Sequence, residues 1–89
     1  MTQDEFNSKW DDYLELGFYG LSFDNEEVAK YLDQEFTKEI KHNPDFSFWQ
    51  IKVKFGSVRI YANVDEKTQR RWEWKVNKIM RDFKLNGTK

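Results

Sequence analysis

Residues 49–64 read WQIKVKFGSVRIYANV, and apolar and polar side chains alternate along both arms of this stretch. A period of two is typical of strands that bury one face. A two-residue loop at Gly56-Ser57 suits a type II′ turn, whose twist matches that of paired strands. The stretch therefore predicts an antiparallel hairpin that turns at Gly56-Ser57.

This turn also predicts which residues face each other across the two strands. The expected apolar pairs are Phe55–Val58, Val53–Ile60, Ile51–Ala62 and Trp49–Val64. The other face then holds Lys54 opposite Arg59, Lys52 opposite Tyr61 and Gln50 opposite Asn63. A slip of one residue would bury the charges instead, so we expect an apolar inner face and a basic outer face.

Apolar residues recur at helical spacing on both sides of the hairpin. A first helix is predicted to open at a capping box, Thr2 with Glu5, and to stop at Gly17. A second helix is expected to follow a cap at Asp24 and end at 43–45, and a third to follow a cap at Asp65 and run to about Lys84. The predicted buried stripes are Phe6, Trp10, Tyr13 and Leu14; Val28, Tyr31, Leu32, Phe36 and Ile40; and Trp72, Val76, Ile79, Met80 and Phe83.

These elements predict an α+β fold of order helix-helix-strand-strand-helix. A lone two-stranded hairpin is marginal in water, so the three helices must cover its apolar face. The aromatic segment 18–23 is either a connector inserted into the core or a short extra strand. The 89 residues have room for one core, and we expect a single domain over 1–89, with an ordered part over about 2–85 and a flexible tail at 86–89.

Composition excludes several classes of function. The chain has no cysteine and one histidine, His42, so neither a disulfide framework nor a transition-metal site is expected. His42 falls at a predicted helix end, where a basic group favours the dipole. No apolar run approaches the roughly 20 residues that span a bilayer, and the acidic start is no secretory signal. We expect a cytoplasmic protein without cofactor, metal or membrane association.

The net charge of −1 conceals an uneven distribution of charge along the chain. Residues 1–49 contain four basic and twelve acidic side chains, whereas residues 50–81 contain nine basic and three acidic ones. Either the acidic helices lie beside the basic segment and neutralise it, or the molecule has two oppositely charged faces, one of which meets a partner. The carboxylates stand at ordinary solvent-face spacing, so we expect no catalytic pair and no enzyme.

Two basic surfaces are candidates for partner contact. On the outer face of the hairpin, Lys54 and Arg59 form a like-charge pair that costs stability, and Lys52 and Tyr61 extend this face. Either an acidic side chain compensates or water screens the repulsion. The other surface surrounds Trp74, which lies almost opposite the buried stripe of its helix. Its cationic neighbours on that helix are Arg70, Arg71, Lys78 and Arg81.

Trp74 itself has two interpretations. It is either packed against the first helix or exposed to a partner, and tryptophan and arginine are enriched in interface hot spots. Cation–π contacts within the monomer are a further reason for this clustering.

The hairpin string from Gln50 to Tyr61, QIKVKFGSVRIY, resembles the QIK-x-KFG-x-x-R-x-Y hairpin of a family of small uncharacterised proteins of phages and bacteria. In that family a Gly-aromatic stretch and an acidic helix precede the hairpin, as residues 17–21 and the following helix do here. The resemblance covers about residues 17–62. Family members often continue into a cysteine-containing segment, which this chain lacks, so nothing is carried over to its C-terminal part. The resemblance implies a shared fold and a phage or bacterial setting, and no reaction.

Two functions follow from these features. The leading one is a non-catalytic adaptor or inhibitor that binds a protein. The alternative is a nucleic-acid-binding module, in which the basic side chains neutralise phosphates while Tyr61 and Trp74 stack on bases. Against this alternative, the isoelectric point near 5.8 places an acidic field close to any bound phosphate. Homodimer formation through the strand edges stays open.

Overall fold

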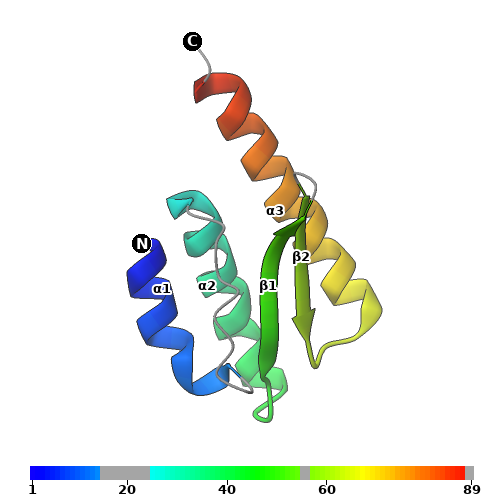
Figure 1. The fold of residues 1–89 in the computed structure, drawn as a ribbon. Helices are drawn as coiled ribbons and strands as arrows, with labels where there is room; N and C mark the ends of the chain where they lie inside the picture. Colours follow the sequence, from blue (N-terminus) through cyan, green and yellow to red (C-terminus); the bar gives the residue numbers. More distant parts are fainter. Residues whose placement is uncertain (15–24, 55–56, 88–89) are drawn as a thin grey trace.

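The computed structural model describes residues 1–14, 25–54 and 57–87, without the side chains of 52–54 and 83–87. Its elements are α1 (Gln3–Trp10), the short 3-10 helix η1 (Asp11–Tyr13), α2 (Glu26–His42), β1 (Phe48–Lys54), β2 (Ser57–Ala62) and α3 (Glu66–Gly87) (Figure 1). The predicted α+β fold and its order of elements are confirmed. None of the described helices is both long and apolar enough to cross a membrane.

Side-chain caps set where the helices begin. The Thr2 hydroxyl accepts a hydrogen bond from the Glu5 N–H at 3.1 Å and the Glu5 carboxylate accepts one from the Thr2 N–H at 2.9 Å, so the predicted capping box opens α1. Asp65 caps α3 as predicted, by accepting from the Thr68 N–H at 3.0 Å.

The predicted cap of α2 at Asp24 is wrong. The cap is Asn25, whose side-chain oxygen accepts from the N–H groups of Glu27 and Val28 at 2.9 and 3.2 Å. Asparagine and aspartate are about equally good N-caps, because the side-chain oxygen of either residue can accept from the first free N–H groups of a helix. The pattern of polar residues before the helix therefore allowed either start.

The first helix is shorter than predicted. It ends at Trp10 and continues as the single turn η1, after which Leu14 has an extended backbone and forms a parallel bridge with Phe48 of β1. This bridge needs an extended residue at position 14, which is incompatible with a helix running to Gly17. Gly17 itself and the segment 18–23 lie outside the described residues.

The observed register of the two strands is shifted by two residues from the predicted one. Val53 faces Val58, Ile51 faces Ile60 and Lys54 faces Ser57, so Ser57 belongs to β2 and not to the turn. The predicted pairs of Val53 with Ile60 and of Ile51 with Ala62 are therefore wrong. A shift of two residues keeps each residue on its own face, because side chains alternate with a period of two. Ile51, Val58 and Ile60 are accordingly fully buried, as predicted.

A bulge between Phe48 and Gln50 changes the start of β1. Phe48 is fully buried opposite Ala62, whereas Trp49 is 38% exposed. The prediction that Trp49 lies on the inner face opposite Val64 is wrong. The extra residue of a bulge reverses the alternation of faces before it, so the inner position passes from Trp49 to Phe48.

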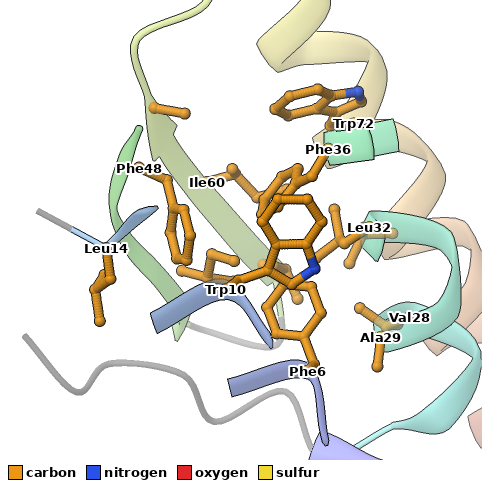
Figure 2. Packing of buried hydrophobic residues seen from close by; sticks show 14 of the residues in the cluster. Phe6, Trp10, Leu14, Val28, Ala29, Leu32, Phe36, Phe48, Ile60 and Trp72 are labelled. Carbon is orange, nitrogen blue, oxygen red and sulfur yellow. The ribbon is translucent and has the colours of Figure 1, made fainter. Parts of the chain in front are cut away.

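Aromatic rings from five segments meet in the core at Phe36 of α2. The Phe36 ring centroid lies 4.9 to 5.7 Å from the ring centroids of Phe6, Trp10, Phe46, Phe48 and Trp72. Figure 2 shows Phe36 with Trp10, Phe6 and Trp72 around it. The predicted stripes supply most of this core, with Tyr13, Tyr31, Ile40, Ile79 and Met80 partly buried at its margin.

Helix α3 covers the outer edge of β2. Asn77 accepts a hydrogen bond from the Val58 N–H at 2.7 Å and donates one to the Val58 carbonyl oxygen at 3.3 Å. Glu73 accepts one from the Ile60 N–H at 2.9 Å. Side chains of a helix thus take the place of a third strand, and in Figure 1 α3 follows β2 along this edge before its C-terminal end extends beyond the sheet. The β2 edge of the hairpin is therefore covered by α3 at Val58 and Ile60.

Candidate partner-binding site

Trp74 is the most exposed large apolar side chain in the described part of the chain, at 62%. Its helix is held on one side by Trp72 and Val76, which are buried in the core, and on another by the hydrogen bonds of Glu73 and Asn77 to β2. With these two sides occupied, Trp74 points away from both. Of the two interpretations of Trp74, packed against the first helix or exposed, the structure shows the exposed one.

Beside Trp74 lies an open hollow of about 500 Å³ between α2 and α3. Its walls are Tyr31, Glu35 and Lys38 of α2 and Arg71, Trp74 and Lys75 of α3. Residues 31, 35 and 38 share one face of α2 because they are four and three positions apart, and residues 71, 74 and 75 share one face of α3 for the same reason. The hollow is thus formed by the flanks of two packed helices.

Glu35 joins the two helices at the base of this hollow. One carboxylate oxygen accepts from Arg71 at 3.2 Å and from the Trp72 indole N–H at 3.1 Å, and the other lies 3.3 Å from the Lys38 ammonium. The Glu35 side chain is 12% exposed, so the Arg71 pair is partly shielded from solvent. Here an acidic residue of the first half neutralises a cation of the second, as one of the two accounts of the charge asymmetry expected.

Tyr31 supplies a half-buried hydroxyl to the same hollow. Burial raises the pKa of this hydroxyl above its usual value, and the Glu35 carboxylate raises it further, while Arg71 partly offsets both effects. The phenol therefore stays neutral at physiological pH and can both donate and accept a hydrogen bond.

The cations around Trp74 fall into two groups. Arg71 and Lys38 contact Glu35, and Arg70 pairs with Glu66 one turn away. Within the described residues, Lys75 and Lys78 have no ion pair; the Lys78 ammonium lies 5.3 Å from the Trp74 ring centroid, within the range of a cation–π contact. The hollow walls contain three cations and one carboxylate, so their net charge is positive. Arg81, the fifth predicted contact on α3, is exposed.

The outer face of the hairpin is a separate surface. Arg59 is exposed and faces Lys52, so the predicted pairs of Lys54 with Arg59 and of Lys52 with Tyr61 are wrong, although a like-charge pair persists. Tyr61 is half-buried and faces Gln50. The side chains of Lys52 and Lys54 lie outside the described part. Neither Arg59 nor Tyr61 lines the hollow beside Trp74, so the structure does not join the two predicted surfaces there.

Four of the residues at the hollow were missed from the sequence. Tyr31 was assigned only to a core stripe, Glu35 only to the carboxylates at solvent-face spacing, and Lys38 and Lys75 to no surface. The i, i+4 spacing of Tyr31 and Glu35 shows that they share a face of α2, but no local pattern indicates that this face meets α3 beside Trp74.

Within the described ranges, no three metal-ligating side chains gather in one place. No protein-family model, curated protein or solved structure is significantly similar to this chain.

Proposed function

We propose that this domain is a non-catalytic protein-binding module, an adaptor or inhibitor, and that it engages its partner through Trp74 and the adjoining hollow between α2 and α3. The observation that carries the proposal is the exposure of Trp74, at 62%, beside that hollow. Two of the other tryptophans, Trp10 and Trp72, are almost fully buried. An exposed indole on a rigid, well-packed helix resembles the anchor of an interface hot spot.

The size of the indole makes this anchor energetically useful. A tryptophan side chain buries up to about 250 Å², so covering its exposed part removes on the order of 100–150 Å² of mostly apolar surface from water. At about 25 cal/mol per Å², this corresponds to about 2–4 kcal/mol of gross binding free energy. That range reaches the threshold that defines a hot spot.

The resemblance of the hairpin to small phage and bacterial proteins supports a role inside a bacterial cytoplasm. A phage-encoded adaptor or inhibitor would act on a host protein there. The resemblance thus supports the setting of the proposed function.

The proposal is tested by comparing Trp74→Ala with Trp49→Ala, which removes another exposed tryptophan from a different surface. Each variant and the wild type are used as bait in a bacterial lysate, and retained proteins are quantified by mass spectrometry. We expect Trp74→Ala to remain folded by circular dichroism and to lose a partner that the wild type and Trp49→Ala both retain. The partner is then purified and its affinity for the three baits measured by calorimetry.

Two results would contradict the proposal. If Trp74→Ala retains the same proteins as the wild type, Trp74 is not a contact. If the wild type instead binds a short single-stranded DNA or RNA at low salt, with an affinity that falls steeply as salt rises, the module binds nucleic acid. The pairing of Arg70 with Glu66 and of Arg71 with Glu35 disfavours that outcome, because these cations are already partly neutralised.

A further inference from the structure

We infer that the segment bound at the hollow between α2 and α3 is an acidic peptide segment of a protein, in which carboxylate side chains flank an apolar or aromatic residue. This inference rests on the proposed function and adds the chemistry of the partner. In this arrangement the apolar residue covers the Trp74 indole, and the flanking carboxylates meet Lys75 and Lys78.

Three cations run along one face of α3 beside Trp74. Arg71, Lys75 and Lys78 stand at positions i, i+4 and i+7, which places them in a row. Like charges at i, i+4 destabilise a helix by a few tenths of a kcal/mol. Glu35 relieves this repulsion at Arg71, but within the described residues no carboxylate pairs with Lys75 or Lys78. An anionic ligand would pair with these two lysines and relieve the repulsion along the row.

The contacts of Glu35 hold the site in place before a partner arrives. By bonding to both Arg71 and the Trp72 indole, Glu35 fixes the spacing of α2 and α3, while the buried Trp72 and Val76 anchor the Trp74-bearing turn. A preorganised site loses less conformational entropy on binding than a mobile one. Within the described residues Lys75 and Lys78 have no ion pair, and the ammonium of Lys78 lies over the Trp74 ring, so both charges are available to carboxylates beside the indole.

The mixture of groups at the hollow favours a peptide over a phosphate-rich ligand. Trp74 and the neutral Tyr31 hydroxyl offer an apolar surface and a hydrogen-bonding group, which suit a side chain and a peptide backbone. The Glu35 carboxylate at the base would repel a dense array of phosphates. The twelve acidic and four basic residues of 1–49 add to this repulsion of a ligand with many negative charges. An anionic ligand must therefore bind through a few charges placed close to the lysine row.

The test is a selection from a random-peptide display library on the folded wild-type domain, with depletion on Trp74→Ala. Enriched peptides are synthesised and their affinities measured for the wild type, for Lys75→Glu/Lys78→Glu and for Lys41→Glu/Lys67→Glu. The last variant makes the same change of charge at exposed positions that do not line the hollow. All variants are first checked by circular dichroism and thermal unfolding.

We expect enriched peptides in which Asp or Glu flanks an aromatic or aliphatic residue. Their affinity should fall by about tenfold or more in Lys75→Glu/Lys78→Glu and by less than about threefold in Lys41→Glu/Lys67→Glu, because two direct charge contacts become repulsive in the first variant. The affinity for the wild type should also weaken as salt rises.

The outcomes separate failure of this inference from failure of the proposed function. Enriched peptides that need Trp74 but contain no acidic residues overturn the acidic partner and leave the Trp74 surface in place. Enriched peptides that bind Trp74→Ala as well as the wild type overturn both. Absence of any enrichment overturns the inference alone, because the lysate comparison of Trp74→Ala with Trp49→Ala decides the proposed function independently.

Discussion

Replacing Asn77 by alanine removes both hydrogen bonds by which α3 covers the edge of β2 at Val58. These bonds measure 2.7 Å to the Val58 N–H and 3.3 Å to its carbonyl oxygen, and Val58 itself is fully buried. Each intramolecular hydrogen bond contributes about 0.5–1.5 kcal/mol net, and a buried N–H left without a partner costs about 1–3 kcal/mol. Alanine regains roughly 0.5 kcal/mol through its higher helix propensity. The free energy of unfolding should therefore fall by about 1.5–3 kcal/mol.

This change is large for a small domain. At about 4–8 °C per kcal/mol, the melting temperature of Asn77→Ala should fall by roughly 10 °C. With an m-value of about 1–2 kcal/mol per M of urea, the midpoint of unfolding should fall by roughly 1 M or more at an unchanged m-value. Urea titrations followed by far-ultraviolet circular dichroism measure the midpoint and the m-value, and a thermal scan of the same signal measures the melting temperature.

Arg81→Ala is the matched control, since Arg81 is exposed on the same helix and, within the described residues, has no ion pair. We expect this variant to stay within about 0.5 kcal/mol of the wild type. If Asn77→Ala is equally close to the wild type, the side-chain cover of β2 does not stabilise the fold and the reasoning is refuted. Removing Glu73 as well, in Asn77→Ala/Glu73→Ala, should free the edge and produce concentration-dependent association in sedimentation velocity.

Two further changes test the core and a helix cap. Phe36→Ala removes the ring at the centre of the aromatic cluster and should destabilise the domain by about 3–5 kcal/mol in the same urea titration; a cost below about 1.5 kcal/mol would mean that the cluster repacks around the gap. Hydrogen bonds from the side chain and the backbone N–H of Thr68 hold the pKa of Asp65 below its usual value. The ionised carboxylate therefore stabilises the folded state above about pH 4, and this stabilisation is lost as the pH falls through the lowered pKa. The difference in stability between the wild type and Asp65→Ala should therefore narrow as the pH is lowered from 6 towards 3, and a difference that is constant or grows over this range would contradict the assignment.

The sequence by itself determined the elements and the face that each one buries. Apolar residues at helical spacing identified the buried sides of the three helices, and alternation identified the inner face of the hairpin except at its start, where Phe48 and not Trp49 is buried. These signals are local, because the period of a helix or strand brings its apolar residues to one side whatever lies opposite. Capping residues were equally readable at Thr2 and Asp65, where a polar side chain bonds to the N–H group three positions further along the chain.

The tertiary structure decided the register of the hairpin. Pairing Val53 with Val58 or with Ile60 keeps the same residues on the same face, so the alternation in the sequence is compatible with both. At the bulge, which places Phe48 rather than Trp49 on the inner face, Phe48 makes long-range contacts: Leu14 bridges to it from a distant part of the chain, and its ring packs against Phe36 in the core.

Only the tertiary structure also brought together the residues of the candidate site. Sequence reasoning found Trp74 and its cationic neighbours on α3, since these neighbours lie within about two turns of Trp74 on the same helix. It could not place Glu35 against Arg71 and Trp72, which are 36 and 37 residues away, nor Asn77 against Val58, 19 residues away. Such contacts are made by single polar side chains that follow no period, and they form only because the core sets the distance and angle between α2, α3 and β2.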